Sequence, residues 1–310
     1  MPDENLTQLT VAQLGPLIQR GEISPLEVAK AFLRRIDSLE PHLNAFITRL
    51  DEHALQAARD AEAEILRGNY RGPFHGIPVG LKDLFWTKGI RTTSGSLIDS
   101  AFVPAEDSAV ASLIKAAGAY CIGKLHMTEY AFDGTSLNHH YGPALNPWDP
   151  TRMAGGSSSG SGVAVASGEV PIALGTDTGG SVRVPSALCG ITGLKPTFGL
   201  ISRFGVTPLA WSMDHVGPMA RTVWDAALAL NMLVGHDSRD QGSAQMQRQD
   251  YLEDLGRGIQ GVRVGVPQEF IWEIMDLEVE QAFRTALPQI ESLGASIQEV
   301  SAPDLGLINA

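Results

Sequence analysis

The chain has 310 residues, 44% of them hydrophobic, which is enough for one large domain or two small ones with a substantial core. Its formal net charge of −12 disfavours direct binding to nucleic acid, which normally uses a basic patch. No apolar stretch approaches the roughly 18 residues that a membrane span needs, so we expect no membrane segment.

The first residues and the two cysteines indicate the cellular compartment of the protein. The chain starts with Met1-Pro2-Asp3-Glu4-Asn5, which is acidic and polar and unlike a signal peptide. Cys121 and Cys189 lie in apolar sequence and are too few for a disulfide framework. We therefore expect a cytoplasmic protein with reduced thiols. The eight histidines form no metal-binding spacing, so we expect neither a metal nor a cofactor.

Helical patterns occupy the first 70 residues. They lie at residues 8–20, 24–39 and 51–67. The second helix has a clear start, with Ser24 as N-cap, Pro25 at the first helical position and Glu27 completing a capping box. Nothing in this layer indicates chemistry.

From Gly76 onward, strand and helix patterns alternate. Strands are expected at residues 77–82, 120–124, 171–175, 262–266 and 296–300. Helices are expected at residues 107–117, 161–168, 224–234 and 278–293. The alternation predicts an α/β fold in which helices cover a largely parallel or mixed sheet. Residues 236–250 are polar and have the character of a mobile loop or linker.

Two clusters of glycine and serine carry the strongest functional signal. They span residues 155–162 (GGSSSGSG) and 176–181 (TDTGGS), and a small-residue helix and an apolar strand are expected between them. Glycine lets a backbone amide approach a ligand closely, and a serine hydroxyl becomes a nucleophile once a base removes its proton. A flexible linker can also be rich in these residues, but the apolar run between the clusters is typical of buried core.

Lys82 is the candidate base. It ends an apolar strand, and burial there would lower the pKa of its ammonium below the reference value of about 10.4. A neutral amine can accept a proton. Taken alone, Lys82 fits better a lysine that reaches solvent from the end of a strand.

Together these segments resemble the amidase signature family of serine hydrolases. Ser157 lies 75 residues after Lys82 and 24 residues before Ser181, which fits the Lys–Ser–Ser arrangement of that family. The resemblance extends over nearly the whole chain, through residues 146–148 (NPW), 189–190 (CG), 193–196 (GLKP) and 214–218 (DHVGP). One departure is Ser159, where the family usually has glycine.

The resemblance implies a fold and a domain assignment. The fold is α/β, with a central mixed β-sheet covered by helices on both faces. Residues 1–310 form a single amidase signature domain in this interpretation. Its parts are a helical layer (1–70), the signature core (71–235) and the start of a C-terminal part (236–310). Because family members usually run further, we expect the chain to be C-terminally incomplete.

The resemblance also implies catalytic roles. Ser181 is the nucleophile, Lys82 is the terminal base, and Ser157 bridges them from a cis peptide bond after Gly156. Ser181 attacks the amide carbonyl while Ser157 relays its proton to neutral Lys82, because a hydroxyl both donates and accepts. Water then hydrolyses the acyl-enzyme.

Residues around the nucleophile complete the expected site. The backbone N–H groups expected to hold the oxyanion are those of Thr178, Gly179, Gly180 and Ser181. Asp177 and Arg183 are expected to form an ion pair that supports this turn, and Ser158 either hydrogen-bonds in the same network or simply holds the turn. For Asp177 and Arg183, the alternative is a surface pair that contributes little.

Three functions stay open within the family. The leading one is an amidase that hydrolyses a non-peptide carboxylic amide to an acid and ammonia or an amine. Phe85 and Trp86 are candidates to line an apolar acyl pocket, although a core role fits them equally. The second is the glutaminase (A) subunit of a tRNA-dependent amidotransferase, and the third is an inactive truncated member. The expected partners are a small-molecule amide and, as an option, a second copy in a homodimer, without direct nucleic acid or membrane.

A different class of hydrolase is disfavoured. Residues 156–160 match the G-x-S-x-G elbow of α/β-hydrolases, with Ser158 as nucleophile. That elbow should directly follow a strand, whereas residues 150–154 (PTRMA) are poor strand sequence.

Overall fold

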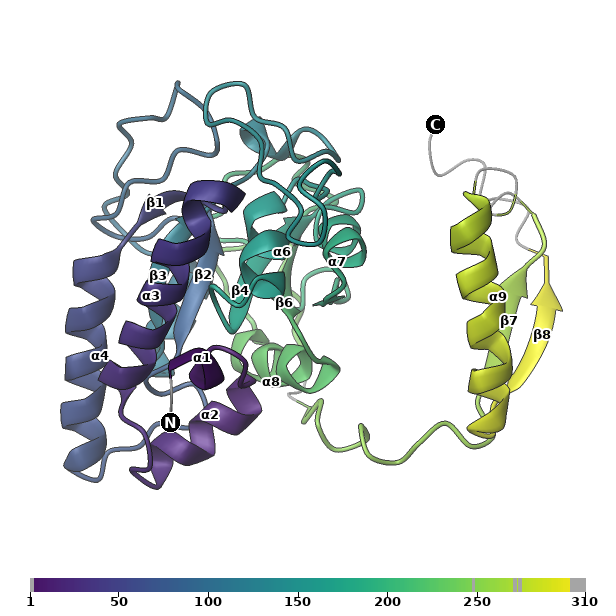
Figure 1. Cartoon of the computed structure of the whole chain (residues 1–310), viewed down its shortest axis with the longest axis horizontal. Coiled ribbons are helices and arrows are strands. Elements are labelled where there is room, and N and C mark those ends of the chain that lie inside the picture. The colour runs from purple at the N-terminus through teal and green to yellow at the C-terminus, as the bar shows by residue number, and fades with distance from the viewer. Residues whose placement is uncertain (1–2, 247–248, 270–271, 273–274, 302–310) are drawn as a thin grey trace. The chain divides into compact units, whose positions relative to one another are not determined.

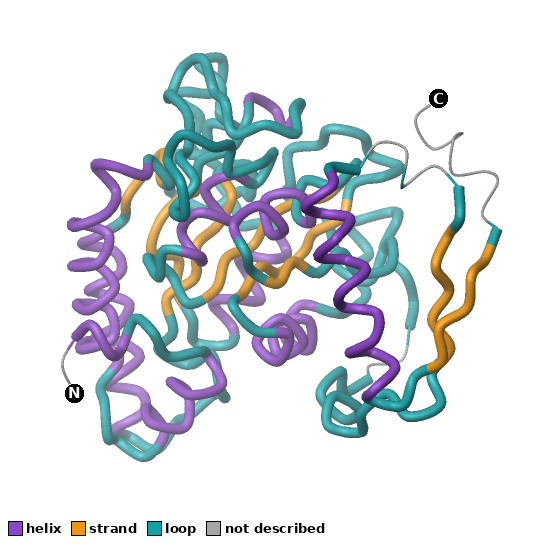
Figure 2. Tube along the Cα trace, turned by 45° about the vertical axis from the view of Figure 1, so that its right-hand side comes forward, coloured by secondary structure: helices purple, strands orange, loops and turns teal. Residues whose placement is uncertain are grey.

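The structure is a computed structural model that describes residues 3–246, 249–269, 272 and 275–301. The chain forms two compact units, residues 1–251 and residues 252–310 (Figures 1 and 2). Each unit is described by itself below. The assignment of residues 1–310 to one domain of three parts stays a prediction.

A six-stranded mixed sheet forms the centre of the larger unit (Figure 1). Its strands are β1 (Phe46–Arg49), β2 (Pro78–Lys82), β3 (Tyr120–Leu125), β4 (Ile172–Asp177), β5 (Thr192–Gly193) and β6 (His215–Ala220). They lie in the order β1-β3-β2-β4-β6-β5. Strand β2 is parallel to β3 and β4, whereas β1, β6 and β5 pair antiparallel with their neighbours.

Helices cover the sheet on both faces, which confirms the expected fold class. They are α1 (Asp3–Leu6), α2 (Val11–Gln19), α3 (Pro25–Leu43), α4 (Asp51–Leu66), α5 (Ala109–Ala116), α6 (Ser159–Ala166), α7 (Arg183–Cys189) and α8 (Val223–Leu233), with a short 3₁₀ turn at Glu129–Ala131. Helix α6 contacts β2, β3, β4 and β6, and α7 packs beside it. Helix α5 packs on β3 and against α8, which also contacts β5 and β6.

The direction of the central strands positions the functional residues. Every residue of β2, β3 and β4 is buried, as expected for strands covered on both faces. Because β2 and β4 are parallel neighbours, their carboxyl ends meet at one edge of the sheet. Lys82 ends β2, and Thr176 and Asp177 end β4, so this edge collects the polar residues of the candidate site.

The expected N-terminal helices are present with shifted ends. Ser24 caps α3 by accepting from the Glu27 amide, and the Glu27 carboxylate accepts from the Ser24 amide in return. Helix α3 continues beyond residue 39 and ends at Asn44, which is left-handed with φ 54°. Strands β1, β5 and β6 and helix α7 were not predicted from the sequence.

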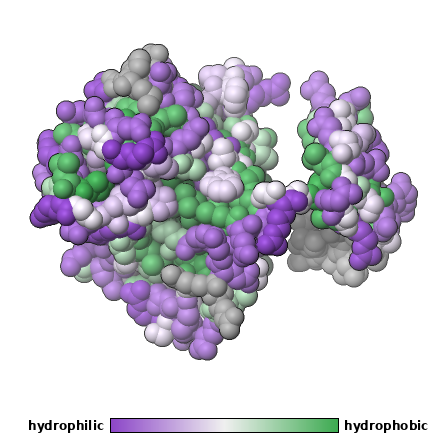
Figure 3. All heavy atoms as spheres, turned by 90° about the horizontal axis from the view of Figure 1, so that it is seen from below, coloured by the Kyte–Doolittle hydropathy of each residue, from purple (hydrophilic) through white to green (hydrophobic). Residues whose placement is uncertain are grey.

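The smaller unit contains β7 (Arg263–Pro267), α9 (Leu277–Ser292) and β8 (Ser296–Val300), with β7 and β8 paired in parallel. These elements match the three expected there. The face drawn in Figure 3 carries both hydrophilic areas and hydrophobic patches. Among the helices of the described residues, none is long and apolar enough to cross a membrane.

Candidate active site

Lys82 lies at the end of β2 with its side chain fully buried. Its ammonium nitrogen is 2.7 Å from Ser157 Oγ and 2.9 Å from Thr176 Oγ1. Both partners are uncharged hydroxyls, so neither offsets the cost of burying a cation. The structure therefore excludes the alternative in which Lys82 reaches solvent.

Burial changes the protonation of this lysine. The loss of hydration lowers the pKa of Lys82 from 10.5 to about 7, while the negative charges of Asp177 and Asp214 act in the opposite direction. A substantial fraction of the side chain is then a neutral amine at neutral pH. Such an amine can accept a proton through its lone pair.

Ser157 is held where the first glycine-serine cluster crosses the carboxyl edge of the sheet. The Gly156–Ser157 peptide bond is cis, as the resemblance implied. A Cβ atom on Gly156 would lie 1.8 Å from the Thr135 carbonyl oxygen, so only glycine fits there. The Ser157 side chain is fully buried, and its carbonyl accepts from the Thr128 amide at 3.3 Å.

The second cluster meets the first through Ser158. The Ser158 amide donates to the Ser181 carbonyl at 3.2 Å, which places the two expected catalytic serines on adjoining backbone. The Ser158 hydroxyl accepts from the Thr176 amide and donates to the Thr176 carbonyl, each at 3.2 Å. Ser158 thus links the start of α6 to β4, which fits its expected supporting role. Because its hydroxyl is hydrogen-bonded to the Thr176 backbone, Ser158 is a poor candidate for the nucleophile of a G-x-S-x-G elbow.

Ser181 lies beside a cavity of about 260 Å³ that Gly156, Gly179, Val184 and Leu209 help to line. The residue is partly exposed, in contrast to the buried Ser157. Within the described part of the chain, the Ser181 hydroxyl makes no hydrogen bond and no bond to Ser157. Its hydroxyl is therefore available to a molecule that enters the cavity.

The backbone amides before Ser181 divide into two groups. The Gly180 amide donates to Asp177 Oδ1 at 2.9 Å, so it is occupied and does not serve the expected oxyanion role in this arrangement. Among the described residues, the amides of Thr178, Gly179 and Ser181 have no hydrogen-bond partner. Three of the four expected donors are thus left for a ligand.

Asp177 organises this turn. Its fully buried carboxylate accepts from the Gly180, Val182 and Arg183 amides and pairs with the Arg183 guanidinium, at 3.0 Å from Nε and 2.8 Å from Nη2. Burial alone would raise the pKa of Asp177, but the hydrogen bonds from Arg183 and from the Val182 amide lower it overall. The expected ion pair is present, and because one partner is buried it is not a loose surface pair.

Several contributors were missed in the sequence. Thr176 contacts Lys82 directly, and Asp214 accepts from the Thr178 hydroxyl and from the Leu209 and Ala210 amides. No short spacing connects residues 178 and 214, because their contact depends on the antiparallel pairing of β4 with β6. The DHVGP segment was noted only as part of the family resemblance, which did not reveal this contact.

The departure at Ser159 has a structural counterpart. Ser159 Oγ lies 2.9 Å from Nδ1 of the buried His126, whose Nε2 lies 2.8 Å from the Gly142 carbonyl. The carbonyl can only accept, so Nε2 carries the proton and Nδ1 accepts from Ser159. Burial lowers the pKa of His126 to about 4, which keeps the ring neutral.

The aromatic residues that follow Lys82 do not line the cavity beside Ser181. Phe85 is fully buried in the core, and Trp86 packs edge-to-face on Phe102. The suggestion of an acyl pocket at Phe85 and Trp86 is therefore replaced by their core role. No group of three or more His, Cys, Asp or Glu side chains in the described ranges is placed to hold a metal ion.

A central mixed β-sheet covered by helices on both faces is the fold of solved amidase structures. The peptide amidase of Stenotrophomonas maltophilia has the same fold, with a TM-score of 0.91 and 34% identity over 97% of this chain and 63% of that one. A second solved structure comes from a vestigial protein complex described in connection with the origins of an s-triazine catabolic enzyme. It matches with a TM-score of 0.92 and 37% identity, over 96% of this chain and 65% of that one.

The family model described as Amidase matches residues 27–310, and the chain belongs to this family. It is also 45% identical to the glutamyl-tRNA(Gln) amidotransferase (A) subunit of Carboxydothermus hydrogenoformans, over 96% of this chain and 61% of that protein. The chain thus spans about 61% of the length of that relative.

Proposed function

We propose that this chain hydrolyses a non-peptide carboxylic amide to an acid and ammonia or an amine, with Ser181 as nucleophile and Lys82 and Ser157 as proton relay. The observation that carries the proposal is the contact of 2.7 Å between Lys82 Nζ and Ser157 Oγ in a fully buried setting. The lowered pKa of Lys82, at about 7, supports its role as a base.

The proposed first step forms a bond between Ser181 Oγ and the amide carbonyl carbon. The Ser181 proton passes to Ser157 Oγ as the Ser157 proton passes to neutral Lys82, so one proton reaches the amine and Ser157 stays neutral. The carbonyl oxygen becomes an oxyanion, which the free amides of Thr178, Gly179 and Ser181 can stabilise. One such donor contributed roughly 2.7–4 kcal/mol in a model enzyme.

The proposed second half returns the proton. When the C–N bond breaks, Lys82 gives its proton back through Ser157 to the leaving nitrogen, and the acyl group stays on Ser181. Water then attacks the ester and loses a proton along the same relay, after which the C–O bond breaks and Ser181 recovers its proton. The acid leaves and the relay is restored.

An activity-based probe tests the mechanism. The purified chain is incubated with a fluorophosphonate and the modified serine is mapped by mass spectrometry. We expect labelling at Ser181 that falls at least a hundredfold in Lys82→Ala and Ser157→Ala, because the nucleophile loses its base. Lys88→Ala, at an exposed lysine, is the matched control and should label normally. Labelling of another serine, or labelling unchanged in Lys82→Ala, would refute the relay.

A second candidate is the glutaminase component of an amidotransferase built from several chains. The 45% identity to a glutamyl-tRNA(Gln) amidotransferase (A) subunit favours it. Such a component would work with other chains, whereas the amidase would act alone or as a homodimer. Ammonia release from glutamine by the purified chain, compared with release from a neutral amide, separates the two. For either function we propose a cytoplasmic location, which suits the free and buried Cys121 and Cys189.

A further inference from the structure

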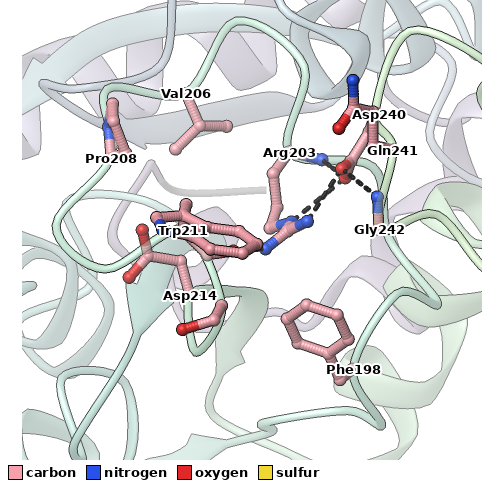
Figure 4. Close-up of a pocket in the computed structure, with 10 residues that line it drawn as sticks. Phe198, Arg203, Val206, Pro208, Trp211, Asp214, Asp240, Gln241 and Gly242 are labelled. Atoms are coloured by element: carbon pink, nitrogen blue, oxygen red, sulfur yellow. Dashed lines mark hydrogen bonds and ion pairs between the residues drawn. The ribbon is translucent and has the colours of Figure 1, made fainter.

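A second cavity borders the same loop as the Ser181 cavity. Its volume is about 520 Å³, twice that of the cavity beside Ser181. Side chains that line it include Phe198, Arg203, Val206, Pro208, Trp211 and Asp214 (Figure 4). The size is within the range of small-molecule sites, about 300–1,000 Å³.

The charged side chains that line this cavity all have polar partners within the chain. Arg203 donates from Nε and Nη2 to the two oxygens of Asp240, at 3.1 and 2.8 Å, and Figure 4 shows these contacts. The Asp240 carboxylate also accepts from the Arg203 and Gly242 amides. Asp214 accepts from the Thr178 hydroxyl and from the Leu209 and Ala210 amides. Arg203, paired with Asp240, attracts an anion only weakly, and Asp214 keeps its negative charge because its partners are neutral.

The remaining walls are apolar and aromatic. Trp211 is 80% exposed and Phe198 is 38% exposed, and both line the cavity. The Arg203 guanidinium lies 4.5 Å from the centre of the Phe198 ring and donates to the Trp211 carbonyl. These groups offer flat surfaces to an aromatic ring, which stacks on indole, phenyl and guanidinium planes alike.

The cavity is joined to the proposed catalytic turn. Leu209 lines the Ser181 cavity, while its neighbour Pro208 lines the larger one. Asp214 belongs to the wall of the larger cavity and accepts a hydrogen bond from Thr178, whose amide is one of the free donors. The two cavities therefore border the same stretch of chain.

We propose that this cavity binds an uncharged aromatic group of the amide substrate, with Trp211 and Phe198 as the residues that determine this specificity. The inference rests on the proposed amide hydrolysis. It names the substrate class as neutral amides with an aryl substituent, in place of small aliphatic or charged amides. The neutralised Arg203 and the nearby Asp214 carboxylate disfavour an anionic ligand.

Calorimetric titration of the full chain tests binding separately from turnover. The Ser181→Ala variant is titrated with phenylacetamide, with acetamide and with phenylacetate. Phenylacetamide should bind at least tenfold more tightly than either of the others. In Ser181→Ala/Trp211→Ala its affinity should fall at least tenfold, and Phe198→Leu should weaken it by a smaller factor. Trp148→Ala is the matched control, because Trp148 is 75% exposed and does not line this cavity.

The outcomes distinguish this inference from the proposed function. Equal affinity in the Trp211→Ala and Trp148→Ala variants, or tighter binding of phenylacetate, overturns the assignment of the cavity. Because Trp211 is largely exposed, its removal should leave the thermal midpoint unchanged, which excludes unfolding as the cause of lost affinity. Turnover of phenylacetamide by the unmodified chain is a separate measurement. If phenylacetamide is not turned over but still binds in a Trp211-dependent way, the proposed hydrolysis is refuted and the binding site in this cavity is supported.

Discussion

Replacing Lys82 with methionine should abolish fluorophosphonate labelling and at the same time make the protein more stable at pH 7. The side chain is fully buried, and both of its partners are hydroxyls. A buried amine without a counter-ion costs folding free energy, because the unfolded state binds a proton that the folded state gives up. Methionine has similar volume and no charge, so it removes that cost.

The magnitude follows from the two pKa values. The pKa of Lys82 is 10.5 in the unfolded chain and about 7 in the folded one. Burying Lys82 therefore lowers the free energy of unfolding by about 4 kcal/mol at pH 7 and by about 2 kcal/mol at pH 9. The unfolded state binds more protons over this interval, so the stability of the wild-type chain rises with pH. The hydroxyls of Ser157 and Thr176 lose a partner in Lys82→Met, at about 1 kcal/mol each. The variant should therefore be about 2 kcal/mol more stable at pH 7 and about equal at pH 9.

Urea denaturation of both proteins at pH 7 and pH 9 measures this change. The difference in free energy of unfolding between variant and wild type should shrink by about 2 kcal/mol over the interval. Lys88→Met, at an exposed lysine, controls for the loss of any positive charge and should show no such trend. A difference that stays constant from pH 7 to pH 9 would show that Lys82 is not neutral in the folded state.

Three further outcomes follow from the same contacts. The kcat/KM for a neutral amide should fall about tenfold per pH unit below a midpoint near pH 7, because only neutral Lys82 accepts the proton; a flat profile from pH 5.5 to 8 contradicts this. Gly156→Ala should lower the thermal midpoint strongly, since its Cβ would lie 1.8 Å from a carbonyl oxygen, whereas Gly134→Ala, which has open space, should not. Ser159→Ala should cost about 1–3 kcal/mol in urea denaturation, because it leaves the buried His126 Nδ1 without a donor; an unchanged stability would count against this hydrogen bond.

The parts of the fold that the sequence predicted are those with local signals. Ser24 and Glu27 form a capping box whose spacing is visible within one helical turn, and β2 is an apolar run between a glycine and a lysine. Strand β6 was missed because Gly217 and Pro218 interrupt any strand pattern. It forms a strand because six of its residues pair with β4, a contact that depends on tertiary structure.

In the candidate site too, residues with a local sequence signal were predicted, and contacts that depend on tertiary structure were not. The glycine-serine clusters and Lys82 were found from residue type and spacing, and the structure brings Lys82 and Ser157 into contact. The role of the Gly180 amide was misassigned because its orientation depends on Asp177, which draws that N–H toward itself. Asp214 and Trp211 could not be placed, since the loop that carries them approaches Thr178 only once β4 and β6 are paired.

Two buried lysines on neighbouring strands show which feature marks the base. Lys124 on β3 and Lys82 on β2 are both fully buried. Lys124 lies 3.2 Å from the Asp83 carboxylate and also donates to Thr92 and to the Phe85 carbonyl, so its cation is paired. Lys82 contacts only hydroxyls, and its charged form has no adjacent anion. Burial lowers the pKa of both lysines, but the Asp83 carboxylate in contact with Lys124 opposes that effect, whereas Lys82, beside the serines, has no anion in contact.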